Sequence, residues 1–181
     1  GSVRMEGSAA EVSSAYSTFL NRLGSSSDLH QRLPGVSMTA SPGTGHIVKA
    51  KARVDGGAEG SEVALRSAQS DVAITIGFVI DPKLPTPSVA VGISDASGFT
   101  IASAGSHNDG IPLAMDESGH GQATVMFRRL PLLKGQYFVT CFLASEDGVH
   151  VYDQALHCIT LNVTQQGLEQ GVVSLPHDWL P

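Results

Sequence analysis

Most of the chain beyond residue 45 alternates between apolar and polar positions. In Val72–Ile80, every second residue is Val, Ile or Phe. Side chains of a β-strand point alternately to two faces, so this pattern predicts strands that bury one face in a core. Similar alternation occurs in His46–Val54, Val89–Ile93, Phe99–Ser103, Gln122–Phe127, Tyr137–Leu143, His150–Tyr152 and His157–Val163.

These segments predict an all-β fold. Turn-forming residues separate the strands, as in Asp95–Gly98 and Glu146–Gly148. Short alternating strands with frequent turns are typical of an Ig-like antiparallel β-sandwich, jelly-roll-like in its layers. A closed barrel is the alternative. Strands and helices do not alternate along the sequence, which makes a doubly wound α/β enzyme fold improbable.

The N-terminal part of the chain has a different pattern. Ser8 and Glu11 form a capping box, and Gly24 stands where a helix would stop. The apolar stripe between them consists of Val12, Ala15, Tyr16, Phe19, Leu20 and Leu23. This spacing predicts a short amphipathic helix over about residues 9–23. We therefore divide the chain into a linker with this helix, 1–45, and a β-sandwich domain, 46–181.

Composition narrows the functional classes. The 181 residues include 11 Lys and Arg against 17 Asp and Glu, a net charge of −6. A general nucleic-acid-binding protein would concentrate basic residues, so we expect no nucleic-acid partner. No apolar run approaches the length of a membrane span.

The two cysteines do not make a disulfide framework. Strand parity places Cys141 inward and Cys158 outward, which is a poor geometry for a bond between them. We therefore expect two reduced thiols.

Catalytic and metal-binding motifs are missing from the sequence. There is no P-loop, no G-x-S-x-G elbow, no H-E-x-x-H and no cysteine pair at zinc spacing. The run Ser106–Asp109 contains the residue types of a catalytic triad, but adjacent residues of a loop rarely converge in that way. Most aspartates occur in or beside predicted turns, where their side chains bond the nearby backbone. We expect no catalytic residue and no metal ligand in this chain.

Because the sequence offers no catalytic or metal-binding motif, the function that we expect is binding on a sheet surface. One predicted sheet face carries Lys51 and Arg53, which would suit an acidic sugar or a phosphate. The other predicted face carries two aromatic rings flanked by hydroxyl and amide side chains, namely Phe138, Thr140, Phe142, Thr160 and Asn162. Aromatic rings pack on the apolar faces of sugars, and polar side chains pair with sugar hydroxyls. These seven residues are the predicted carbohydrate-binding residues. The alternatives are a solvated face for the cations and a face covered by the N-terminal segment or a partner subunit for the rings.

The second half of the chain resembles a known family. Its segments are Ser88–Gly98, with the sequence SVAVGISDASG; Leu130–Val139, with LPLLKGQYFV; Tyr152-Asp153; Ile159–Val163; and a tail ending in His177-Asp178-Trp179. Their order is similar to that of the C-terminal carbohydrate-binding domain of Wzt-type proteins. These are the ATP-binding subunits of ABC transporters that export O-antigen polysaccharide.

The resemblance implies an Ig-like sandwich, usually a homodimer with exchanged terminal strands. It implies non-catalytic recognition of the non-reducing terminus of a lipopolysaccharide O-antigen at the cytoplasmic, inner face of the bacterial inner membrane. The complete protein would contact its permease through a separate ATPase domain that binds Mg-ATP, while this chain itself would hold no cofactor. The alternative is a structural dimerisation sandwich without a glycan ligand.

Overall fold

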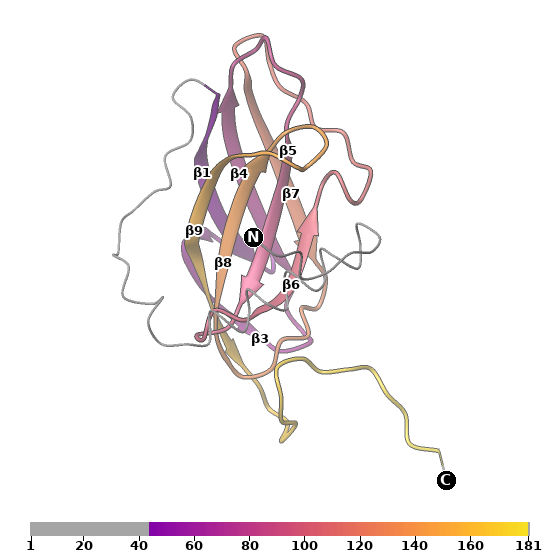
Figure 1. The fold of residues 1–181 in the computed structure, drawn as a ribbon. Coiled ribbons are helices and arrows are strands. Elements are labelled where there is room, and N and C mark those ends of the chain that lie inside the picture. Colours follow the sequence, from indigo (N-terminus) through magenta and orange to yellow (C-terminus); the bar gives the residue numbers. More distant parts are fainter. Residues whose placement is uncertain (1–43, 181) are drawn as a thin grey trace, which may run out of the picture.

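A computed structural model describes residues 44–180, which form two β-sheets packed face to face (Figure 1). The four-stranded sheet has the order β2-β1-β4-β7 and consists of β1 (Gly45–Val54), β2 (Glu59–Gly60), β4 (Val72–Ile80) and β7 (His120–Phe127). The five-stranded sheet has the order β3-β9-β8-β5-β6 and consists of β3 (Glu62–Arg66), β5 (Ser88–Ser94), β6 (Thr100–Gly105), β8 (Gly135–Ala144) and β9 (Val151–Thr164). The predicted all-β sandwich is confirmed. The helix predicted over 9–23 lies outside the described residues.

The core lies between the two sheets and follows the predicted alternation. Its fully buried side chains come from every second position of the central strands, and they include Ile74, Ile76 and Phe78 of β4, Val91 and Ile93 of β5, Val139, Cys141 and Leu143 of β8, and Ile159 and Leu161 of β9. Removing this apolar surface from water is the main driving force for pairing the sheets.

The strand directions differ from the prediction in one pair. β3 runs parallel to β9, whereas every other neighbouring pair of named strands is antiparallel. The glycine-rich run Gly56–Ser61 is typical of a hairpin or loop tip, and the structure forms an antiparallel hairpin there between β1 and β2. The sequence contains little alternation beyond this run, where β3 follows directly after β2. The prediction of an entirely antiparallel sandwich is therefore wrong at this edge.

A bulge in β1 reverses part of its predicted parity. The register with β4 shifts between Ile47 and Lys49. As a result, Val48 is 62% exposed although the alternation of His46–Val54 puts it on the same side as Ala50 and Ala52, and Ile47 packs against the core. The amide of Ile47 donates a hydrogen bond to Asp153 Oδ2 at 2.8 Å, which ties the bulge to β9 of the other sheet.

A second irregularity lies in β9. We predicted two short strands here, but the structure has one long strand with a register shift against β8. Between the pairs Val139–Ile159 and Cys141–Ala155, one residue of β8 faces three residues of β9, 156–158. His157 in this bulge has φ = 45°, in the left-handed region.

Beyond β9 the chain continues as a tail at one end of the sandwich (Figure 1). Its first part is fastened to the segment before β8 by a bridge between Leu132 and Val173 and by a hydrogen bond from the Leu133 amide to the Val172 carbonyl. The final residues include Trp179 and Leu180, which are 90% and 88% exposed. In the described part of the chain, no helix is long and apolar enough to cross a membrane.

Candidate functional site

Five of the seven predicted binding residues lie together on the outer face of the five-stranded sheet. Phe138, Thr140 and Phe142 alternate with buried residues along β8 and are half-buried. In the register with β9, Thr160 stands opposite Phe138. Asn162 stands one pair further along the same face, opposite Gln136. The structure therefore brings both rings and the three polar side chains onto one surface.

The strand beside the rings carries only small side chains on this face. In β5, Ala90 pairs with Phe142, and Gly92 pairs with Thr140. Gly92 lies beside the Phe142 ring, since a Cβ placed on the glycine would be 3.7 Å from Phe142 Cε2. The rings are consequently larger than any side chain that β5 places beside them on this face.

The bulge in β9 adds a residue to this face that the sequence pattern did not reveal. The rings of His157 and Phe138 have centroids 5.2 Å apart and are tilted by 33°. The backbone amide of His157 donates a hydrogen bond to Thr140 Oγ1 at 3.3 Å. An imidazole next to a phenyl ring extends the aromatic surface and supplies ring nitrogens that can bond sugar hydroxyls. Alternation alone could not place His157, because the bulge disrupts it.

A row of polar side chains borders the platform at the β3 edge. Gln136 Nε2 donates to Asn162 Oδ1 at 3.1 Å, and Asn162 Nδ2 donates to Glu62 Oε1 at 2.8 Å. These bonds fix the orientation of the Asn162 amide. Glu62 was not among the predicted residues, since β3 was not recognised from the sequence. The row presents exposed amide and carboxylate oxygens that can accept hydrogen bonds from hydroxyls.

Lys51 and Arg53 lie on the outer face of the other sheet. They pair with Thr75 and Ala73 of β4. The Lys49 ammonium on the same strand is 2.8 Å from the Glu59 carboxylate. The whole sandwich separates these cations from Phe138 and Phe142, so one sugar residue cannot contact both groups. The structure thus divides the predicted residues into two separate surfaces.

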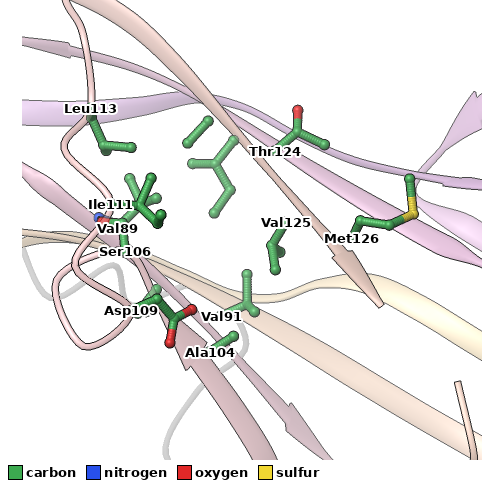
Figure 2. A pocket seen from close by; sticks show the side chains of 14 residues that line it. Val89, Val91, Ala104, Ser106, Asp109, Ile111, Leu113, Thr124, Val125 and Met126 are labelled. Atoms are coloured by element: carbon green, nitrogen blue, oxygen red, sulfur yellow. The ribbon is translucent and has the colours of Figure 1, made fainter. Parts of the chain in front are cut away.

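Two of the hollows formed by residues 44–180 lie near β6 and the loops beside it, away from this face. One, of about 220 Å³, opens between the sheets at the side of β6 and β7. Figure 2 shows Val89, Val91 and Val125 along its apolar interior, with Asp109 at the β6 side. The second, of about 510 Å³, lies among the loops and is lined by residues that include His107, Ile111 and Glu146. None of the seven predicted residues lines either hollow.

The residues of Ser106–Asp109 do not form a catalytic triad. The Ser106 hydroxyl accepts a hydrogen bond from the Val89 amide at 3.0 Å, and His107 Nδ1 is 2.9 Å from the Glu146 carbonyl oxygen. Each side chain thus bonds backbone from another loop or strand. Within residues 44–180, no group of three or more His, Cys, Asp or Glu side chains is placed to hold a metal ion.

Several aspartates close turns, as predicted. Asp95 accepts hydrogen bonds from the Ser97 hydroxyl and from the amides of Ser97 and Phe99, and the pKa of its carboxyl lies below the usual value, chiefly because of the Ser97 hydroxyl. Asp116 makes the same kind of turn with the amides of Ser118 and His120, and its pKa is likewise lowered, first by the His120 amide. These carboxylates stabilise loops and show no catalytic arrangement.

The prediction for the cysteines is wrong in its geometry. The Cys158 side chain is half-buried and packs against the core, and its Sγ lies 3.5 Å from Cys141 Sγ. The physical reason is the β9 bulge, which carries Cys158 out of the regular alternation. Both thiols are free in the structure.

Comparison with known proteins decides the family. A model of the Wzt C-terminal domain matches residues 40–175 of this chain. The chain belongs to the Wzt C-terminal domain family. Wzt proteins are ABC transporter subunits. The members of this family are their non-catalytic C-terminal domains. The resemblance identified from the sequence segments is thereby confirmed.

The crystal structure of a Wzt C-terminal domain has the same fold. The crystal structure of the C-terminal domain of wzt superposes with a TM-score of 0.68 at 15% sequence identity, covering 85% of this chain and 95% of that chain. A glycosyl hydrolase family 2 member from Bacteroides cellulosilyticus gives a TM-score of 0.45 at 12% identity, covering 65% of this chain and 15% of that chain. The search of curated proteins returned no match.

Proposed function

We propose that this domain binds the non-reducing terminus of an O-antigen polysaccharide on the outer face of its five-stranded sheet. The observation that carries the proposal is the pair of half-buried rings, Phe138 and Phe142, which lie four residues apart on one strand, beside the small residues of β5. Membership of the Wzt C-terminal domain family supports a carbohydrate ligand.

The chemistry of this face fits a sugar. The apolar side of a pyranose can pack on the Phe138 and Phe142 rings, and its equatorial hydroxyls can reach Thr140 and Thr160 between and beside them. The exposed row that ends at Glu62 adds acceptors at the border. A surface of this openness buries little area, so we expect micromolar affinity. Selectivity follows from hydrogen bonds that a different sugar would leave unpaired.

The proposal includes the partners that belong to such a transporter subunit. In the complete protein, an ATPase domain binding Mg-ATP would couple this domain to the membrane permease at the cytoplasmic side of the inner membrane. A second copy of the chain is the proposed partner of the C-terminal tail, because the exposed apolar side chains of Leu175, Trp179 and Leu180 would be costly to leave in water.

The decisive experiment is isothermal titration calorimetry with the O-polysaccharide of the source organism. We expect saturable binding by the intact polysaccharide and loss of binding after the non-reducing end is trimmed by an exoglycosidase. A polysaccharide from an unrelated serotype serves as the control ligand. No heat of binding with the cognate polysaccharide would overturn the carbohydrate function and favour a structural dimerisation domain, which the exposed tail would also suit.

A further inference from the structure

Cys141 and Cys158 form a close thiol pair across two strands. Cys141 belongs to β8 and is completely buried, and Cys158 belongs to β9 and is half-buried. Their sulfur atoms are 3.5 Å apart. A disulfide requires about 2.05 Å, so a shift of the two side chains by roughly 1.5 Å in total would join them.

The pairing is a product of the bulge rather than of regular strand register. Cys141 is opposite Ala155 in the ladder, and Cys158 is three residues further along β9. The two surplus residues of the bulge turn the Cys158 side chain back toward β8. A local irregularity of this kind is often retained where it re-aims a side chain.

The two thiols differ in solvent exposure and in pKa, and both differences make Cys158 the one that reacts first. Solvent reaches Cys158 but not Cys141, so an external reagent meets Cys158 first. As a thiol, Cys158 can donate to the Val139 carbonyl oxygen at 3.4 Å. Once ionised, it accepts a hydrogen bond from the Cys141 thiol, which lowers the pKa of Cys158 to about 7. The same hydrogen bond, together with burial, raises the pKa of Cys141. Thiolates are the attacking form in exchange.

We propose that Cys141 and Cys158 are a redox-active pair that exchange with a low-molecular-weight disulfide converts into a cross-strand disulfide. The Cys158 thiolate attacks one sulfur of the reagent, forming a mixed disulfide and releasing one thiolate. Cys141 then gives up its proton, which passes through solvent to a released thiolate, and its sulfur attacks the Cys158 sulfur of the mixed disulfide and releases the second thiolate. Two cysteine thiols are oxidised, and the reagent is reduced to two thiols.

Closing this bond acts on the proposed sugar-binding face. His157 immediately precedes Cys158, has a left-handed backbone and stacks on Phe138. Drawing the two sulfurs together moves Cys158, which is bonded directly to His157. The disulfide therefore changes the position of the His157 imidazole beside Phe138. The effect on glycan binding rests on the proposed function, whereas the exchange chemistry does not.

The exchange is tested with oxidised glutathione as the reagent on the fully reduced protein. We expect loss of both free thiols with Ellman's reagent, a mass lower by two hydrogens, and a Cys141–Cys158 cross-linked peptide. In Cys141→Ser, the mixed disulfide on Cys158 should persist as a glutathione adduct, while Cys158→Ser should remain unmodified. Retention of both thiols in the wild-type protein, or accumulation of its glutathione adduct, would overturn the proposal whether or not the serine variants fold.

A separate NMR experiment tests whether the disulfide changes the position of His157 on the binding face. The imidazole C–H resonances of His157, assigned with a His157→Gln variant, should shift when the disulfide forms and return on reduction. Unchanged resonances in protein shown to be oxidised would overturn the coupling. Calorimetry of reduced and oxidised protein with the polysaccharide then separates the two ideas. If neither form binds, the proposed function fails while the exchange result stands.

Discussion

The rings of His157 and Phe138 stack at a 33° tilt with centroids 5.2 Å apart, although 18 residues separate them in the chain. Their contact depends on two long-range features, the pairing of β8 with β9 and the bulge in β9. The candidate site is therefore a property of the folded sheet, and any change that straightens the bulge removes part of it.

Replacing Phe142 by alanine should weaken polysaccharide binding with little effect on folding. The side chain is half-buried and stands beside Gly92 on the outer face, so truncation removes a stacking surface without opening a cavity in the core. We expect a loss of about 1–3 kcal/mol in binding free energy, measured by calorimetry.

The matched control is Ile111→Ala. Ile111 is an apolar residue, 58% exposed, that lines both hollows away from the platform. It should leave the affinity unchanged. If Ile111→Ala weakens binding and Phe142→Ala does not, the sugar site lies in the hollows. A collapse of the melting temperature in Phe142→Ala would instead assign its ring to packing.

Charge removal at Lys51 and Arg53 should leave binding at the ring face intact. Both residues occupy the outer face of the four-stranded sheet, on the opposite side of the sandwich. The double variant Lys51→Gln, Arg53→Gln should therefore bind a neutral polysaccharide as well as the wild-type protein does. A tenfold or greater loss, about 1.4 kcal/mol, would place the ligand on the cationic face. Circular dichroism melting checks that the variant is folded.

The sequence alone predicted the two-sheet sandwich and the buried face of most of its strands. In β4, β5 and β8, uninterrupted alternation of apolar residues gave the correct parity, and this parity placed Phe138 and Phe142 together on an outer face. Period-two alternation is a local property, and burial between two sheets enforces it wherever the ladder is regular.

The errors coincide with irregular ladders and long-range pairing. The bulge of β1 reverses the predicted parity at Ile47 and Val48, and the bulge of β9 interrupts it at residues 156–158, whereas the strand beyond each bulge keeps its predicted faces. A bulge depends on the partner strand as much as on its own residues. For this reason Cys158 was predicted outward and His157 was overlooked. The parallel partnership of β3 with β9 joins segments about 100 residues apart, and no local pattern encodes it.

Two Gly→Ala substitutions should differ sharply in stability. At Gly121 in β7, an added Cβ would be 2.3 Å from Phe78 Cζ and 2.6 Å from the Ala114 carbonyl oxygen, so the buried Phe78 ring must move. We expect Gly121→Ala to lower the free energy of unfolding by about 1–3 kcal/mol. Gly92→Ala is the control, because its Cβ meets only Phe142 at an ordinary 3.7 Å. Urea denaturation measures both, and equal stability of the two variants would contradict this account of the β7 packing.

Asp71 should contribute stability that acid removes. Its carboxylate accepts a hydrogen bond from the Arg129 amide at 2.8 Å and one from the Arg128 guanidinium at 3.0 Å, and these bonds, the amide first, lower the pKa of the carboxyl in the folded state. A carboxyl with a lowered folded pKa stabilises the fold above its unfolded pKa, near 4, and this contribution disappears as the pH falls through the folded value.

Asp71→Asn should therefore melt at a lower temperature than the wild-type protein at neutral pH, and the difference should shrink as the pH falls below about 4. Differential scanning calorimetry across this range provides the measurement. Asp81→Asn is a suitable control, because Asp81 also accepts a backbone amide, that of Lys83, but has no arginine partner among its described contacts. A difference between wild type and Asp71→Asn that stays constant from neutral to acidic pH would show that Asp71 acts through its shape and neutral hydrogen bonds, and that its charge contributes nothing.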